Sequence, residues 1–494
     1  MGFNPTLISC LLIAVFVMLL KWTQREDKLP LINGKKRFDF GGHQVRMAFA
    51  TRLPEMLQQG FNKGEVFRLL TPSGIKFVLA PKFAPEILTH PELIPGKFLM
   101  NEFNAYIPGF EVFGLTAQHE ILQDTVRLRL TRQLNKLTRP LTAETAQLLK
   151  NKWPEDANWH EVCPSETAVH IISRLTSMVL VGETIGRDPE WLSTMTNYTT
   201  EAFHATYALN LWPRTLRRFI AYFDPSCRKL RHHIARARAI LLPVKQARSA
   251  AREAEEKEEF DDAIQWLDEV AGEQSFDPTI AQMTLALASI HTTSDLLSQV
   301  LLDLCHREDW NNLVQDLRNE IVSALGGMGW QKIALNRLNL LDSVLKESQR
   351  MRPATLIGIA REATKTMRLS NGTVIPKGSM LFVTNTALRD PKIYHNPDTF
   401  DPYRFANLRA AGSKSAYLVS PSPEHLGFGL GKHACPGRFF AANELKIILC
   451  HMLIKYDLKA VDGSDIASEN TGPVFNSNRA ARIAVRRRQE EINL

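Results

Sequence analysis

Apolar residues recur at intervals of three and four along most of the chain, which is the spacing of helices that bury one face against a core. The pattern is clear over residues 124–150 and 166–181, and it continues through the 190s to the 250s. Residues 279–305 (TIAQMTLALASIHTTSDLLSQVLLDLC) are apolar almost all round, so we expect a helix that is buried on every side. Most of the chain is therefore predicted to be helical.

Strand-like sequence is confined to short stretches. Residues 66–81 (VFRLLTPSGIKFVLAP) contain a Pro-Ser-Gly turn between two apolar runs, which predicts a hairpin. Two further β-rich regions lie near 356–386 and at the C-terminal end. The predicted fold class is mainly α with small β-sheets, and the lack of a long Gly/Ser-rich or Pro-rich linker favours one large domain.

The first twenty residues carry no charged side chain, and residues 3–20 (FNPTLISCLLIAVFVMLL) form a nearly unbroken apolar run. As a helix this run spans about 27 Å, close to the thickness of the hydrocarbon core of the endoplasmic reticulum. Basic residues follow the run, and this asymmetry places the downstream chain in the cytosol. A cleaved signal peptide is the alternative, but it requires a basic start and a small-x-small exit, which this segment lacks.

These features predict a single-pass protein of the endoplasmic reticulum membrane whose folded domain lies in the cytosol. The predicted segments are a transmembrane signal anchor at 1–20, a basic and proline-containing hinge at 21–40, and the folded domain at 41–494. In that orientation the sequons at Asn197 and Asn371 should carry no glycan.

The composition is that of a globular protein, with 494 residues of which 44% are hydrophobic and 23% are charged. Its six cysteines show no paired or C-x-x-C spacing, which argues against a disulfide framework and against a structural zinc site. The net charge of +8 is diffuse and its basic patches lack interleaved aromatic residues, so we expect no nucleic acid partner. Two interpretations of this charge are equally favoured: a basic surface that is only solvated, or a surface that attracts anionic lipid headgroups or an acidic protein.

A glycine-rich turn, FGLGKHACPGRFF at 428–440, surrounds a lone cysteine, Cys435. A dinucleotide-binding turn is excluded because no strand precedes it, and a P-loop is excluded because Leu426 and His433 replace residues that it requires. Proline and the apolar spacing after Cys435 predict the start of a helix, where unpaired backbone N–H groups favour a thiolate. Taken alone, the cysteine could equally be an inert residue of the core.

This turn resembles the haem-binding loop of the cytochrome P450 monooxygenases, F-x-x-G-x-[HR]-x-C-x-G. The residues that match the pattern are Phe428, Gly431, His433, Cys435 and Gly437. The resemblance implies that Cys435 is the axial ligand of the iron of haem b, that His433 meets a haem propionate, and that Phe428 packs beside the sulfur. An anionic sulfur donates electron density to the iron and favours O–O cleavage.

Two further motifs agree with this resemblance. In LKESQRMRP, Glu347 and Arg350 are three residues apart on a predicted helix and can form an ion pair, which in isolation would be an ordinary surface pair. The pair resembles the E-x-x-R motif of the family, and PDTFDPYRF at 397–405 resembles P-x-x-F-x-P-x-R-F, which adds Arg404. The resemblance implies that Glu347, Arg350 and Arg404 form a structural triad behind the haem.

The predicted buried helix contains ASIHTTS at 288–294, in the place of the family's [AG]-G-x-[DE]-T-[TS]. The resemblance implies that Thr292 lines the oxygen pocket and helps to deliver protons, although a threonine in a buried helix usually bonds its own backbone. His291 replaces the acid that relays protons in the family, and a histidine titrates near neutrality and can still carry protons. The family's W-x-x-x-R motif lacks its tryptophan here, which leaves three candidates for a propionate contact: Arg127, Arg129 and Arg132.

Stretches such as GRDPEWLSTMTNYT and DDAIQWLDEVAG resemble a fungal branch of the family that includes ent-kaurene oxidases and terpenoid oxidases of secondary metabolism. The resemblance implies a monooxygenase that inserts oxygen from O2 into unactivated C–H bonds of a hydrophobic, terpenoid or meroterpenoid intermediate. Its implied partners are membrane lipid, a hydrophobic small molecule and NADPH–cytochrome reductase, which supplies electrons from NADPH. The protein is expected to be a monomer. The segments expected to line the substrate pocket are 101–118, 203–213, 284–292 and 354–360, with Phe103, Tyr106, Phe110, Phe113, Leu356 and Ile357 prominent.

Two other classes of protein remain open at this point. A haem protein of the same fold could act without O2, as an isomerase or a sensor, and His291 in place of an acid is the feature that favours this alternative. A cysteine hydrolase that uses Cys435 and His433 is less favoured, because no third group is indicated that would orient the histidine.

Overall fold

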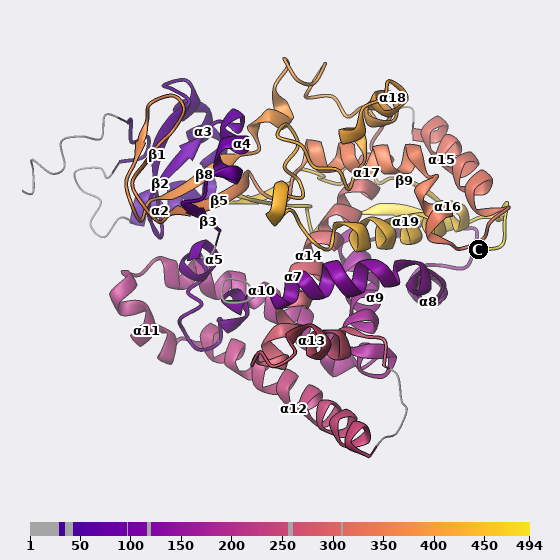
Figure 1. Ribbon diagram of the computed structural model, residues 1–494. Coiled ribbons are helices and arrows are strands. Elements are labelled where there is room, and N and C mark those ends of the chain that lie inside the picture. Colours follow the sequence, from indigo (N-terminus) through magenta and orange to yellow (C-terminus); the bar gives the residue numbers. More distant parts are fainter. Residues whose placement is uncertain (1–28, 35–42, 96, 116–119, 255–259, 308–309) are drawn as a thin grey trace, which may run out of the picture.

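The computed structural model describes residues 29–34, 43–95, 97–115, 120–254, 260–307 and 310–494. The expected signal anchor at 1–20 and most of the expected hinge at 21–40 lie outside this part of the chain. Helices dominate, and the largest sheet lies at one end of the molecule (Figure 1). The predicted fold class, mainly α with small β-sheets, is confirmed.

The helices follow one another from α2 near the N-terminal end to α19 near the C-terminal end. They are α2 (His43–Thr51), α3 (Leu53–Phe61), α4 (Ala84–Thr89), α5 (Lys97–Glu102), α7 (Ile121–Asp124), α8 (Thr131–Lys152), α9 (Pro164–Gly186), α10 (Pro189–Asn210), α11 (Arg214–Phe223), α12 (Pro225–Glu253), α13 (Ala263–Ala271), α14 (Pro278–Cys305), α15 (Trp310–Leu325), α16 (Lys332–Asn336), α17 (Asn339–Met351), α18 (Arg404–Ala410) and α19 (Arg438–Lys455). A π-helical segment, η4 (Thr125–Leu130), joins α7 to α8, and a 3-10 turn, η7 (Gly431–His433), precedes α19.

The largest sheet has five strands in the order β1-β2-β8-β5-β3, and within it β2 and β8 run parallel while the other pairs are antiparallel. The expected hairpin is β1–β2, in which Thr71 pairs with Gly74 across the predicted turn. A second sheet has the order β4-β12-β9, and two further pairs are β6–β7 and β10–β11. The strands are β1 (Val66–Thr71), β2 (Gly74–Leu79), β3 (Leu93–Ile94), β4 (His160–Val162), β5 (Ile357–Ala363), β6 (Met367–Arg368), β7 (Val374–Ile375), β8 (Met380–Thr384), β9 (Tyr456–Ala460), β10 (Glu469–Thr471), β11 (Val474–Asn476) and β12 (Ile483–Arg487).

Helix α14 runs through the middle of the helical body (Figure 1). It begins where the sequence provides a start signal: the Asp277 side chain accepts hydrogen bonds from the backbone N–H groups of Thr279 and Ile280, at 2.9 and 3.1 Å, and proline follows it at the first helical position. Residues 297–305 of this helix are all buried, and burying an apolar side chain such as Leu297 or Leu301 stabilises the fold by about 1.5–3 kcal/mol.

The expectation that α14 is buried on every side is wrong at one point. Ala288 and Thr292 are exposed, although Ile290 and Thr293 beside them are buried. Residues four apart lie on the same face of a helix, so the two exposed residues form one open strip on an otherwise enclosed helix. This strip lies in ASIHTTS at 288–294, the segment expected from the sequence to line the oxygen pocket.

Within the described residues, α9 is long and apolar enough to cross a membrane by length and composition. Most of it is buried inside the protein, and it packs along α14, which is typical of a core helix. Helix α9 is therefore a core helix of the folded domain.

Candidate active site

The turn that carries Cys435 is shaped by glycine. Gly429 and Gly431 have φ angles of +68° and +67°, in the left-handed region that side chains with a Cβ rarely adopt. These turns bring the backbone N–H of Cys435 to within 2.8 Å of the carbonyl oxygen of Phe428. The cysteine therefore lies at a fixed point immediately before α19.

The Cys435 thiol is open to solvent on one side and enclosed by protein on the others. This enclosure raises the pKa of the thiol, while hydrogen bonds from the backbone N–H groups of Gly437 and Arg438 and the charge of Arg438 oppose the increase. A neutral thiol is favoured until a cation compensates the burial. The site thus provides a sulfur that a metal ion can convert to a thiolate.

Four basic side chains gather around this loop. Arg127 donates a hydrogen bond to the carbonyl oxygen of Lys432 at 2.7 Å, and Arg438 donates to the carbonyl oxygen of Cys435 at 2.8 Å. Burial lowers the pKa of His433, and the positive charges of Arg361, Lys432 and Arg127 lower it further. Arg361 is buried in β5, and its one hydrogen bond to a described residue goes to the adjacent carbonyl of Ala360, at 2.7 Å. The four basic side chains are Arg127, Arg361, His433 and Arg438.

The three residues expected to form a triad are brought together. Glu347 and Arg350 are fully buried, and Arg350 donates from Nε and one terminal nitrogen to the two carboxylate oxygens of Glu347, each at 2.8 Å. Arg404 donates from Nε to the same carboxylate at 3.1 Å, and the backbone N–H of Asp401 adds a bond at 2.9 Å. The remaining donors of Arg350 reach carbonyl oxygens of Leu388, Pro397 and Thr399, so the triad fastens α17 to the chain that follows the sheet.

Lys346, next to the triad, holds the segment that leads to the Cys435 loop. Its ammonium group donates to the carbonyl oxygens of Ser415, Tyr417 and Ser420 at 2.8, 2.8 and 2.9 Å. Burial lowers the pKa of Lys346 to about 7. Arg438 holds the same segment from the other side, through the carbonyl oxygen of Val419 at 3.0 Å.

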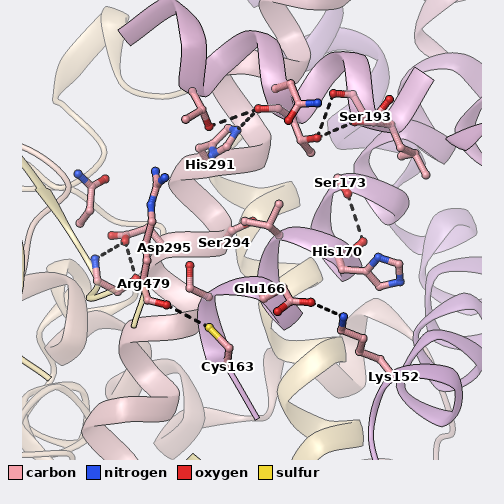
Figure 2. A pocket seen from close by; sticks show the side chains of 18 of the residues that line it. Lys152, Cys163, Glu166, His170, Ser173, Ser193, His291, Ser294, Asp295 and Arg479 are labelled. Carbon is pink, nitrogen blue, oxygen red and sulfur yellow. Dashed lines mark hydrogen bonds and ion pairs between the residues drawn. The ribbon is translucent and has the colours of Figure 1, made fainter. Parts of the chain in front are cut away.

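On α14, the two residues expected to deliver protons face different sides. The Thr292 hydroxyl lies on the open strip and donates to the carbonyl oxygen of Ala288 at 2.8 Å. His291 instead donates from Nε2 to the carbonyl oxygen of Thr196 on α10, at 3.2 Å, and burial lowers its pKa. It lines a polar cavity of about 590 Å³ between α9, α10, α14 and residues 476–482 (Figure 2).

Comparison with known proteins decides the family. The profile described as Cytochrome P450 matches residues 40–482. The chain is 52% identical to "Cytochrome P450 monooxygenase ausG" from Penicillium brasilianum, over 98% of this chain and 92% of that protein. It is 45% identical to "Cytochrome P450 monooxygenase trt6" from Aspergillus terreus, over 94% of each protein. The chain belongs to the cytochrome P450 family.

Membership defines the class of chemistry. This P450 is a monooxygenase, an oxidoreductase with haem b as its cofactor and with electrons from NADPH supplied through a reductase, and its substrate is hydrophobic. A further relative, "Cytochrome P450 monooxygenase ptmU" from Penicillium ochrochloron, is 40% identical over 94% of this chain and 93% of its own length. The prediction of a fungal P450 monooxygenase is confirmed by these relatives.

The residues of the site fit haem b. The sulfur of Cys435 is accessible, and a Cβ at Gly437 would lie 4.0 Å from it. Three guanidinium groups and the imidazole of His433 offer hydrogen-bond donors to two anionic propionates, and Phe428 and Phe439 provide partly exposed aromatic surface. Of the three arginines considered from the sequence, Arg127 meets the loop, whereas Arg129 forms an ion pair with Glu269 at 2.9 Å.

Of the aromatic residues expected in the substrate pocket, Phe103 and Phe113 stack on each other, whereas Phe110 lies within the core. Phe103 stacks on Phe113 with ring centroids 4.4 Å apart, and Phe203 of α10 meets both rings edge-on. Phe110 does not line a pocket, because it is fully buried in the main core. Leu356, at the start of the region around β5, is half-buried and accessible in part.

Sequence reasoning missed Arg361, Arg438 and Lys346. Arg361 carried a signal, because it is a charged residue at an inward position of an alternating strand, IGIAREA. Lys346 and Arg438 depend on carbonyl groups that are distant in sequence, so no local pattern indicates them. The cysteine hydrolase alternative gains no support, because no hydrogen bond joins Cys435 to His433 in the described part of the chain.

Proposed function

We propose that Cys435 is the axial thiolate ligand of the haem iron, and that this P450 oxygenates a terpenoid or meroterpenoid intermediate of fungal secondary metabolism at the endoplasmic reticulum membrane. The observation that carries the proposal is an accessible sulfur, fixed immediately before α19 and surrounded by basic side chains. Haem b, when bound, supplies the activation of O2 and the oxidation of an unactivated C–H bond.

The protein would hold haem b through three kinds of contact. Cys435 would bind the iron, and Arg127, Arg361, His433 and Arg438 would meet the two propionates. Phe428 would pack near the sulfur, and Gly431 and Gly437 would leave room for the backbone to approach the porphyrin. Arg438 thereby acts twice, because it also holds the carbonyl group of Cys435 and stabilises the negative sulfur.

Proton delivery is assigned to two adjacent residues of α14, His291 and Thr292, which act one after the other. The Thr292 hydroxyl holds its proton on the carbonyl oxygen of Ala288 and can turn toward the open side of the helix. His291 is neutral near pH 7, because burial lowers its pKa, so it can accept a proton from the polar cavity and release it. A rotation of His291 away from the carbonyl oxygen of Thr196 is required for transfer to the other side of the helix.

The substrate is proposed to contact Phe103 and Phe203, which pack on the buried Phe113, and the apolar residues Leu356 and Ile357. The planes of the Phe103 and Phe113 rings differ by only 5°, and a flat aromatic surface of this kind suits a fused hydrocarbon ring system. Phe203 is 41% exposed and comes from α10, so it can contact a ligand from the helical side.

Membrane association is proposed to use α11 in addition to the predicted anchor at 1–20. Phe219, Tyr222 and Phe223 of α11 are 65%, 72% and 59% exposed, and Trp212 just before it is 46% exposed. Arginines at 214 and 218 accompany this aromatic surface, a combination that favours an anionic lipid interface. In Figure 1, α11 lies at the edge of the molecule, away from the central helices.

The experiment uses the full chain in membranes with its reductase, NADPH and a panel of terpenoid and meroterpenoid compounds under ¹⁸O2. The proposal predicts a hydroxylated product with one ¹⁸O atom, or a further oxidised product that contains ¹⁸O, and formation of either requires NADPH. The same product formed under argon would contradict it and would favour the haem protein that acts without O2. The panel compound with the highest turnover identifies the substrate class.

A further inference from the structure

The polar cavity that His291 lines is built differently from a pocket for a hydrophobic substrate. Its walls come from α9, α10, α14 and residues 476–482, and it has a volume of about 590 Å³. Hydroxyl-bearing residues of three helices line it, and each hydroxyl donates a hydrogen bond to a backbone carbonyl of its own helix: Ser173, Ser193, Thr196, Thr200 and Ser294. A cavity with so many hydroxyl groups favours a polar ligand.

Basic groups in this cavity outnumber acidic groups. Lys152 and Glu166 form an ion pair and cancel, which leaves Arg479 and Arg482 facing a single carboxyl group, Asp295. Asp295 is itself engaged, because the backbone N–H and the hydroxyl of Ser477 donate to one of its oxygens at 2.6 and 2.9 Å. Two imidazoles, of His170 and His291, add further N–H groups to the wall.

Arg479 lines the cavity with an exposed side chain. Its guanidinium forms no hydrogen bond or ion pair with any residue that the structure describes, and its backbone carbonyl is held by the thiol of Cys163 at 3.3 Å. Figure 2 shows its side chain extending past Asp295 toward His291. Burial lowers the pKa of His291 and the charge of Arg479 lowers it further, whereas burial raises the pKa of Asp295 and the charge of Arg479 opposes that rise. Arg482 forms no ion pair with a described residue, although its charge helps to lower the pKa of Glu166, and it donates to the carbonyl oxygens of Ala480 and Ala481.

We propose that this cavity is a binding site for a phosphate-type oxyanion, held by Arg479 and Arg482. A planar guanidinium binds a tetrahedral oxyanion with two parallel hydrogen bonds, and an unpaired guanidinium in a partly enclosed site is available for this without first breaking an ion pair. The ligand is either a soluble phosphate compound or the headgroup of an anionic phospholipid. The site lies across α14 from the open strip that carries Thr292, so it is separate from the proposed haem pocket.

The test measures binding by calorimetry on the purified, haem-loaded full chain at constant ionic strength. The probes are inorganic phosphate and dihexanoyl phosphatidic acid, and the variants are Arg479→Ala, Arg479→Lys and the double variant Arg479→Ala/Arg482→Ala. The matched control is Arg139→Ala, which removes an exposed arginine of α8 outside the cavity. Each variant is first checked for unchanged thermal stability and an unchanged carbon monoxide spectrum, which show that the fold and the haem site are intact.

Saturable binding of at least one probe, weakened at least about tenfold in Arg479→Ala and retained in Arg139→Ala, supports the proposal. Arg479→Lys should bind with intermediate affinity, because it keeps the charge and loses the two-point contact. Tighter binding of phosphatidic acid identifies a lipid headgroup as the source, and tighter binding of phosphate identifies a soluble ligand. Absence of saturable binding, or equal binding by wild type and the double variant, overturns the proposal.

Discussion

Replacement of Glu347 by glutamine tests how much of the stability of the protein depends on the buried triad. The carboxylate of Glu347 has no exposed surface, and it neutralises two guanidinium groups, those of Arg350 and Arg404. Glutamine has nearly the same shape, but it removes the negative charge and directs an amide N–H toward donors. Removing one partner of a buried ion pair costs about 3–5 kcal/mol, because the remaining charge stays buried without compensation.

The expected shift in melting temperature follows from the size of the protein. Unfolding entropy is about 2.1 cal/mol/K per residue, or about 1 kcal/mol/K for a chain of this length, so the loss corresponds to about 3–5 °C. The matched control is Glu65→Gln, which breaks an exposed ion pair with Lys82 and should cost less than about 1 kcal/mol. Both variants are measured by differential scanning fluorimetry of the purified full chain. Equal melting temperatures for Glu347→Gln and Glu65→Gln would refute the reasoning.

Three further predictions follow from other residues. Thr292→Ala should increase hydrogen peroxide formed per NADPH consumed at the expense of product, and unchanged coupling would remove Thr292 from proton delivery. Burial raises the pKa of Glu444 to about 8, so wild type loses stability as the pH rises from about 4.5 to about 8. Glu444→Gln should therefore be more stable than wild type by about 3 kcal/mol at pH 7 and by little at pH 4.5. A difference in melting temperature that does not change with pH would contradict this. Brominated phospholipids should quench the fluorescence of Trp212, so the fraction of total fluorescence that they quench should be smaller in Trp212→Phe than in wild type. Identical quenching of the two proteins would show that the start of α11 does not reach the lipid.

Much of the fold could be predicted because its signals are local. The start of α14 depends on Asp277 and the following proline, and the hairpin turn of β1–β2 depends on Gly74, so both appear in the sequence at their own positions. Spacing was sufficient for Glu347 and Arg350, since residues three apart on a helix share a face.

The remaining features depend on distant parts of the chain. The open strip of α14 at Thr292 cannot be read from its own composition, because exposure is set by which elements pack against the helix. Phe110 had the same apolar character as Phe103, and only packing placed the former in the core. The contact of Arg127 with the Cys435 loop joins residues 305 positions apart, and for such a contact the sequence offered three candidates of equal merit.

The roles assigned to Phe428, Gly431, His433 and Gly437 all depend on the bond between Cys435 and the haem iron. The most direct measurement is the difference spectrum of the reduced, carbon monoxide-bound protein in membranes that contain the full chain, for wild type, Cys435→Ser and the control Cys163→Ser. The account predicts the absorption band of thiolate-ligated haem in wild type and in Cys163→Ser, and its loss in Cys435→Ser. The same band in Cys435→Ser, with turnover retained, would contradict it.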